Sequence, residues 1–184
     1  MQKSLANDLK DTQWPITVLS KILIISLGDK TRIKLLQQNL GPEDLSKIAV
    51  VLPATDGKTL DVAALEKSGQ YRPTDKFNTL TGGQIGCFIS HRRAWKFLLK
   101  QSNLEHLVIL EDDARIDKSP AAMRKLNRAL KKLKRAGRDW ELLYLGRNPL
   151  LANVLKRPTD DLVVPGRSWG LFGYAVSRKG ARRL

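Results

Sequence analysis

The sequence predicts an α/β protein built on a mostly parallel sheet with helices on both faces. Short runs rich in Val, Ile and Leu alternate along the chain with longer segments whose apolar residues recur at helical spacing. This alternation is typical of a largely parallel sheet, in which ligands bind outside the carboxyl ends of the strands. The 184 residues, 42% of them hydrophobic, suffice for one domain with a closed core.

The first elements read as strand, helix and strand. Residues Ile22 to Leu27 form an apolar, β-branched run that predicts a strand. Asp29 can cap the helix that follows, and Gly41 can end it, because glycine takes the left-handed conformation without strain. A second buried strand, in the stretch "KIAVVLP", is predicted to break at Pro53.

A long helix is predicted after Thr81. Thr81 and Gln84 have the spacing of a capping box, in which each side chain accepts a hydrogen bond from the other residue's backbone N–H. One face of this helix is apolar, which predicts that it packs against the sheet. The face consists of Ile85, Phe88, Ile89, Trp95, Leu98 and Leu99. Cys87 and Trp95 are predicted to be packing residues.

The remaining elements continue the alternation. In chain order they are a strand from Leu107 to Leu110, a helix that begins at Ser119-Pro120 and ends near Gly137, strands at 140–146, 161–165 and 169–177, and a helix that Ser177 starts. No internal repeat or linker marks a second domain. We therefore expect a loose segment at 1–20 and a single domain at 21–184.

The chain is strongly basic, with a formal net charge of +15. This charge predicts attraction to an anionic partner such as nucleic acid, an acidic membrane face or a phosphorylated substrate. Basic residues crowd into Arg124 to Arg138, where Met123, Leu126, Leu130 and Leu133 recur at helical spacing. The segment reads either as a solvated helix face or as the surface that meets such a partner.

Cysteine and histidine are too scarce for most metal sites. One cysteine excludes an internal disulfide, and with two histidines it leaves carboxylates as the expected metal ligands. The longest apolar stretch, Ile22 to Leu27, is far shorter than the roughly 20 residues that a membrane-spanning helix needs. Residues 1–20 do not have the layout of a secretory signal, so we expect a cytoplasmic protein.

Three adjacent carboxylates follow the most apolar strand. Glu111, Asp112 and Asp113 stand where a parallel sheet presents groups to a ligand, and adjacent anions repel one another unless a cation offsets them. Magnesium or manganese would suit these hard oxygen ligands, with the phosphates of a substrate completing the shell. The alternative is an acidic turn that merely ends the strand.

Four stretches, taken together in this order, resemble glycosyltransferase family 25. They are "LTGGQIGCFISHRRAW", "HLVILEDDARID", "WELLYLGR" and "SWGLFGYAVSRKGARRL". The resemblance covers about Lys21 to Leu184. It implies a Rossmann-like fold of the GT-A type, in which an acidic motif after a central strand holds a metal that bridges the diphosphate of the donor.

The resemblance also implies an activity. The chain would be a metal-dependent, inverting glycosyltransferase that moves a hexose, galactose in the first place, from a UDP-sugar donor to a saccharide or glycolipid acceptor in lipopolysaccharide or lipooligosaccharide biosynthesis. The cofactor would be Mn²⁺ or Mg²⁺, bound by Glu111 and Asp113 as the outer pair of a D-x-D-type motif. The basic helix would suit work at an anionic membrane surface, peripherally at the inner face of the membrane.

Further residues are candidates for donor binding, either by the resemblance or, for the glycines and Arg147, by their place at a helix start or just after a strand. These are Ser26, Arg32, Gly83, Gly86, Ser90, His91, Asp112 and Arg147. Four of these assignments have alternatives. The glycines suit a tight loop without a ligand, His91 suits a core position held by hydrogen bonds, and Arg147 suits a surface ion pair.

The chain departs from the family pattern in two places. Gln84 stands where the family usually has Glu, and the sequence stops at Leu184, where the family continues. The domain is therefore expected to lack the family's C-terminal part, and the general base stays unassigned, with Asp160 and Asp161 as candidates. A catalytically impaired, truncated relative that acts as a binding protein is the alternative. A basic nucleic-acid-binding module is disfavoured, because only 6% of residues are aromatic and no recognition motif is present.

Overall fold

The computed structural model describes residues 21–40, 49–73, 80–117, 119–135, 140–149, 154–166 and 168–184. The elements are β1 (Ile22–Ser26), α2 (Lys30–Leu40), β2 (Ala49–Pro53), α4 (Val62–Lys67), α5 (Gly82–Lys100), β3 (His106–Glu111), α6 (Pro120–Arg135), β4 (Leu142–Pro149), β5 (Val154–Thr159), β6 (Leu162–Pro165), β7 (Ser168–Ser177) and α7 (Arg178–Arg183). Five strands form one sheet in the order β2-β1-β3-β7-β4, and β5 pairs with β6 in a separate hairpin.

The sheet is mixed. Strand β1 pairs in parallel with both β2 and β3. Strand β7 runs antiparallel to β3 and to β4, so that β1, β2, β3 and β4 point one way and β7 the other. The predicted α/β class is confirmed, with one strand reversed.

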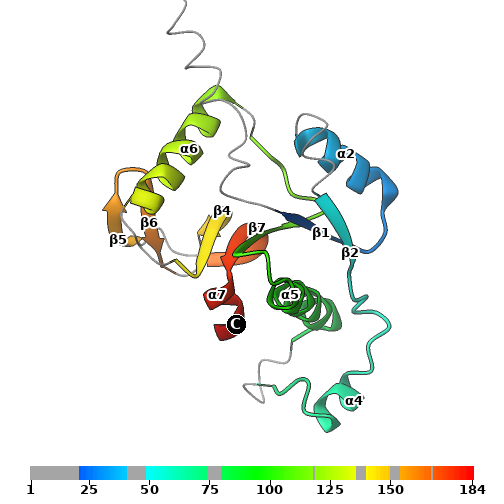
Figure 1. Ribbon diagram of the computed structural model, residues 1–184. Coiled ribbons are helices and arrows are strands. Elements are labelled where there is room, and N and C mark those ends of the chain that lie inside the picture. The colour runs from blue at the N-terminus through cyan, green and yellow to red at the C-terminus, as the bar shows by residue number, and fades with distance from the viewer. Residues whose placement is uncertain are drawn as a thin grey trace, which may run out of the picture.

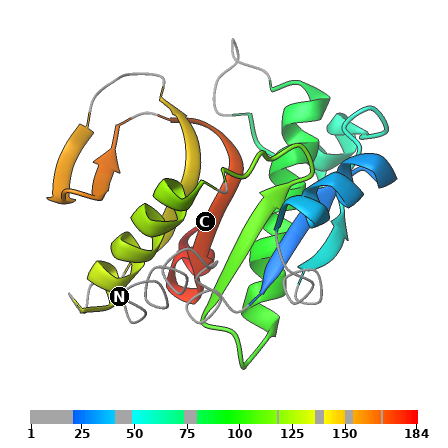
Figure 2. The same cartoon turned by 90° about the horizontal axis from the view of Figure 1, so that it is seen from above.

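Helices cover both faces of the sheet (Figure 1). Helices α5 and α7 pack on one face in a cluster that includes Leu23, Leu98, Ile109, Val176 and Ala181. Helices α2 and α6 pack on the other face in a cluster that includes Ile24, Leu36, Val108, Leu130 and Ala175. Alternate residues of β1 and β3 thus enter opposite cores, because successive strand side chains point to opposite faces. Figure 2, viewed from above, shows α6 over the β4 and β7 side of the sheet and α2 over the β1 side.

Two predicted helix starts are confirmed. The Asp29 carboxylate accepts hydrogen bonds from the backbone N–H groups of Thr31 (2.9 Å) and Arg32 (3.0 Å) at the start of α2. Thr81 and Gln84 form the capping box of α5. Satisfying the free N–H groups of the first turn fixes where each helix begins.

Several other predictions are corrected. Strand β2 is an edge strand rather than a buried one, and its Val50 is 40% exposed. Phe88 is 43% exposed and so does not belong to the packed face of α5. The segments α4 and β5 were not predicted, because each is short and carries no strong apolar periodicity. The predicted helix ends at Gly41 and Gly137 lie outside the described residues.

Helix α7 is fastened to the end of α5 by one side chain. The Arg178 guanidinium donates hydrogen bonds to the backbone oxygens of Leu98 (3.1 Å), Leu99 (3.2 Å) and Gln101 (2.6 Å). The last carbonyls of a helix have no partner within it and carry partial negative charge, so a cation there is favourable. Arg178 therefore joins the two helices that cover one face.

Among the described residues, no helix is both long and apolar enough to cross a membrane.

Candidate functional site

A cleft of about 500 Å³ lies at the carboxyl ends of β1, β2 and β3, where the first turns of α5 close it. Eight of the residues predicted for the site line this cleft. They are Ser26, Arg32, Gly83, Ser90, His91, Glu111, Asp112 and Asp113. The loop after β2 adds Asp56 and Lys58, which the sequence did not single out. The strands are parallel here, so their ends bring residues from distant parts of the chain to one edge.

Asp112 is held by residues of the first βα turn. The Ser26 hydroxyl donates to its Oδ2 at 2.5 Å, and Arg32 Nη1 lies 3.6 Å from its Oδ1. Ser26 Oγ in turn accepts from the Gly28 backbone N–H at 3.0 Å. Only 12% of the Asp112 side chain is exposed. Asp112 therefore links the ends of β1 and β3 and has less freedom to meet a ligand than its neighbours.

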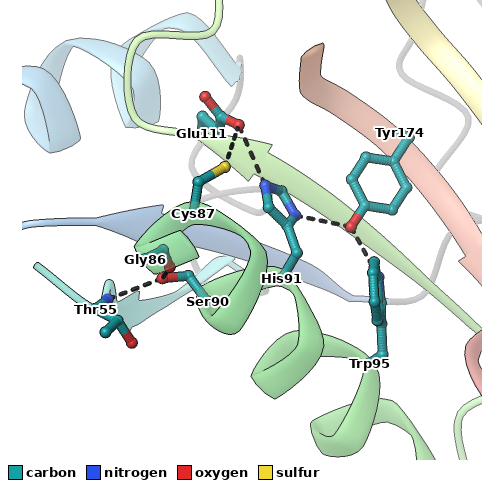
Figure 3. Close-up of polar contacts among 8 residues, drawn as sticks. All are labelled: Thr55, Gly86, Cys87, Ser90, His91, Trp95, Glu111 and Tyr174. Atoms are coloured by element: carbon teal, nitrogen blue, oxygen red, sulfur yellow. Dashed lines mark hydrogen bonds and ion pairs between the residues drawn. The ribbon is translucent and has the colours of Figure 1, made fainter. Parts of the chain in front are cut away.

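Glu111 is held from the opposite side, by α5 (Figure 3). Its Oε1 lies 3.2 Å from Nε2 of His91 and 3.9 Å from Sγ of Cys87. The other ring nitrogen of His91 lies 2.8 Å from the Tyr174 hydroxyl, and the oxygen of this hydroxyl accepts from Trp95 Nε1 at 2.9 Å. His91 is fully buried, whereas 25% of the Glu111 side chain is exposed to the cleft.

Asp113 lines the cleft and has no hydrogen-bond or ion-pair partner among the described residues. None of these residues occupies its carboxylate, so within the part of the chain that the structure describes it is open to a cation. Together with the exposed part of Glu111, it supplies the hard oxygen ligands that a divalent metal ion prefers. Both residues predicted as metal ligands thus line the cleft with carboxylate oxygens of the kind that such an ion prefers. A second set of candidate ligand atoms, from Cys87, His91 and Glu111, lies within 4.8 Å of one another.

Ser90 and Gly86 position the loop that follows β2. The Ser90 hydroxyl accepts from the Thr55 backbone N–H at 2.8 Å and donates to the Gly86 carbonyl at 2.7 Å. A Cβ atom on Gly86 would lie 2.6 Å from the Thr55 carbonyl oxygen, so only glycine lets α5 approach this closely. Gly86 does not line the cleft, and the structure gives it a packing role, whereas Gly83 faces open space.

Three predicted site residues lie away from the cleft. Arg147 was expected to follow the strand predicted at 140–146, but β4 continues through it, and Arg147 Nη1 donates to Ser168 Oγ at 3.2 Å. Asp160 is exposed, and Asp161 accepts from Lys132 Nζ at 2.7 Å and Arg128 Nη2 at 3.2 Å. These hydrogen bonds hold the pKa of Asp161 below its ordinary value, and the one from Lys132 has the largest effect. Part of the basic run thus forms fixed ion pairs.

The sequence predicted that Cys87 packs in the core. In the structure it lines the cleft instead. Partial burial of its thiol and, less strongly, the neighbouring Glu111 carboxylate raise the pKa of Cys87 to about 11. The thiol therefore stays protonated at neutral pH and can donate to Glu111.

This pKa predicts slow alkylation of Cys87. At neutral pH the thiolate population should be roughly 100-fold smaller than that of an ordinary cysteine, and iodoacetamide reacts with the thiolate. The rate should rise about tenfold per pH unit up to about pH 11. Because Cys87 is the chain's only cysteine, mass spectrometry reads its modification directly. Glu111→Gln should speed the reaction, and an unchanged rate would contradict the contact.

Comparison with known proteins finds relatives over most of the chain. Procollagen galactosyltransferase 2 of Mus musculus is 33% identical over 142 residues, which are 73% of this chain and 22% of that protein. A glycosyltransferase 25 family member of Drosophila pseudoobscura pseudoobscura is 32% identical over 175 residues, 90% of this chain and 27% of that protein. The inactive glycosyltransferase 25 family member 3 of Mus musculus is 33% identical over 143 residues, 74% and 24% of the two chains.

The chain spans about a quarter of the length of these curated relatives. The sequence profile described as glycosyltransferase family 25 (LPS biosynthesis protein) matches residues 19–184. That match covers every described element, from β1 to α7. By this match and by the resemblance of its motifs, the chain belongs to glycosyltransferase family 25.

Proposed function

We propose that the chain binds a UDP-sugar in the cleft and transfers its hexose, galactose in the first place, to a saccharide acceptor. The observation that carries the proposal is the pair of carboxylates, Glu111 and Asp113, at the carboxyl end of β3 in a cleft that parallel strands and α5 enclose. Family membership and the relatives named galactosyltransferases support the choice of reaction. The family description supports an acceptor of the lipopolysaccharide kind.

Glu111 and Asp113 would hold a divalent cation, Mn²⁺ or Mg²⁺. When bound, such a cation offsets the negative charge that grows on the leaving diphosphate, and so favours the transition state over the ground state. Asp112 would serve differently, because Ser26 and Arg32 already occupy both of its oxygens. Its contribution is to fix the ends of β1 and β3 on either side of the ligand.

The chain's own groups would bind the diphosphate. Arg32 and Lys58 bring positive charge to the cleft, and the backbone N–H groups at the start of α5, near Gly83, suit an anion. Inversion implies one displacement, in which an acceptor hydroxyl attacks the anomeric carbon and gives its proton to a base. Asp160 and Asp161 lie outside the cleft, so we assign that role to neither.

The acceptor would approach along the basic side of the molecule. Arg124 and Lys125 are exposed on α6, the helix beside the β5–β6 hairpin. Their charge supports contact with a phosphorylated glycolipid at an anionic membrane surface. Binding to vesicles that carry anionic lipid, and its loss at high salt, would test this part of the proposal.

Calorimetry tests donor binding. UDP-galactose is titrated into the protein with and without Mn²⁺, and into Asp113→Ala. We expect binding that depends on the metal and weakens at least about 100-fold in the variant, since loss of even an outer-shell partner costs about 10-fold to 100-fold in metal affinity. Asp160→Ala is the matched control, because it removes the same charge from an exposed position outside the cleft.

Wild-type protein that binds no UDP-sugar with or without metal would overturn the proposal. Binding without any transfer would instead favour the second candidate, an impaired relative that only binds. Relatives named inactive support that candidate, as does Gln84, whose side-chain oxygen is occupied by the Thr81 backbone N–H at 2.8 Å. Salt-dependent binding to any DNA duplex, with no response to nucleotide sugars, would favour a nucleic-acid-binding module.

A further inference from the structure

We infer that Tyr174 is a positioning residue for the cleft. Its hydroxyl donates to Nδ1 of His91 and so holds the ring in the orientation in which the protonated Nε2 anchors the Glu111 carboxylate. The four side chains Trp95, Tyr174, His91 and Glu111 form one continuous line of contacts from the core to the cleft (Figure 3). The part of this inference that concerns ligand binding rests on the proposed function.

The direction of the first hydrogen bond is fixed by chemistry. An indole N–H can only donate, so the contact of 2.9 Å from Trp95 Nε1 makes the Tyr174 oxygen an acceptor. Tyr174 is fully buried, and burial, the largest cause, raises the pKa of its hydroxyl far above the ordinary value. The hydroxyl therefore keeps its proton and needs an acceptor of its own.

His91 Nδ1, 2.8 Å away, is the acceptor that the described residues offer to this hydroxyl. A ring nitrogen that accepts carries no proton, so the neutral imidazole of His91 has its proton on Nε2. That proton points to Glu111 Oε1 at 3.2 Å. Each side chain of the line then donates to the next: Trp95 donates to Tyr174, Tyr174 to His91, and His91 to Glu111.

The donor-to-acceptor direction of these hydrogen bonds argues against His91 as a metal ligand. Cys87, His91 and Glu111 are close enough to share an ion, but an ion on Nε2 would require a lone pair there and would move the proton to Nδ1. That proton would face an oxygen that already accepts from Trp95, and the buried Tyr174 O–H would lose its acceptor. Leaving a buried donor unpaired is unfavourable. The network thus keeps His91 as a donor to Glu111.

Anchoring Glu111 has a consequence for the cleft. Both of its contacts, to His91 and to Cys87, use Oε1, and the side chain is 25% exposed. One oxygen is therefore tied to α5 while Oε2 is left to a ligand. Without the Tyr174 hydroxyl, Nδ1 of His91 would lose its partner and the ring would be held from the Glu111 side alone, so the Glu111 carboxylate would lose its fixed orientation.

The tautomer is measurable by two-bond ¹H–¹⁵N correlation of the histidine rings at mildly alkaline pH. The chain has two histidines, and His106→Gln assigns the signals. We expect wild-type His91 to carry its proton on Nε2 and to show an Nδ1 signal shifted by the hydrogen bond from Tyr174. Tyr174→Phe should keep this tautomer, because the Glu111 carboxylate also favours it, but should lose the shift of Nδ1. Tyr144→Phe is the matched control, because Tyr144 pairs with Tyr174 across β4 and β7 and makes no contact with His91 among the described residues.

A second readout is Mn²⁺ affinity in the presence of UDP, which we expect to fall roughly tenfold in Tyr174→Phe and to stay unchanged in Tyr144→Phe. Wild-type His91 with its proton on Nδ1 would overturn the inference, and this measurement needs no variant. An unchanged Nδ1 signal in Tyr174→Phe would also overturn it. If the Nδ1 signal moves as expected but the wild type binds neither metal nor UDP, the positioning role stands and the proposed function fails.

Discussion

Gly86→Ala is expected to lower the free energy of unfolding by about 1 to 2 kcal/mol. The added Cβ would lie 2.6 Å from the Thr55 oxygen and 2.9 Å from the Gly57 nitrogen, and both are backbone atoms that cannot turn away. Overpacking of this kind costs about 1 to 3 kcal/mol, which exceeds the gain of up to about 1 kcal/mol in helix propensity. The helix must move away from the loop after β2, so the cleft should change shape as well.

Gly83→Ala is the control for this prediction. It lies on the same helix, but its added Cβ would meet only the Thr81 hydroxyl oxygen, at 3.9 Å. The same substitution should therefore raise stability by a few tenths of a kcal/mol to about 1 kcal/mol. Urea unfolding followed by circular dichroism measures both changes. Equal changes in the two variants would show that close approach to the loop does not decide the effect.

Arg178→Met is expected to lower the free energy of unfolding by about 2 kcal/mol. Methionine keeps the apolar stem and removes the guanidinium, so that the carbonyls of Leu98, Leu99 and Gln101 lose their charged donor. Hydrogen bonds with a charged partner contribute about 1.5 to 3 kcal/mol, and a cation at a helix C-terminus adds to this. Urea unfolding again provides the measurement.

Lys179→Met tests whether charge alone explains the effect of Arg178. Lys179 is the next residue, is 51% exposed and lies 3.9 Å from Glu141, so its removal should change stability by less than about 0.5 kcal/mol. Arg178→Lys should fall between the two, because an ammonium keeps the charge but lacks the planar fork. If both methionine variants lose the same amount, the three carbonyl contacts do not stabilise the fold.

The order and type of most elements followed from local sequence. The capping residues Asp29 and Thr81 and the apolar run of β3 are signals that act within a few residues, and the structure agrees with each. The reversed direction of β7 had no local signal, because strand orientation is set by partners far away in the chain. Short elements such as α4 and β5 were missed for lack of periodicity.

The candidate site could likewise be predicted only in part from the sequence. Its position could be predicted, because residues that end parallel strands must share an edge, and Glu111 follows the clearest strand of the sequence. The contacts that hold Glu111 could not be predicted, because His91 and Tyr174 lie 83 positions apart in the chain and the sequence near them contains no signal for their contact. Likewise, the pairing of Asp161 with α6 depends on how the β5–β6 hairpin folds back.

The place of β7 in the sheet determines the order in which the strands can pair while the chain is synthesised on the ribosome. This strand comes last of the seven described strands yet lies between β3 and β4, and β4 has no other partner in the sheet. A nascent chain can therefore pair β1, β2 and β3 early but must leave β4 unpaired until β7 has emerged. Because β7 also carries Tyr174, the anchor of Glu111 arrives with the closing strand. The core is therefore completed, and the cleft ordered, in the same late step of folding, when β7 pairs with β3 and β4.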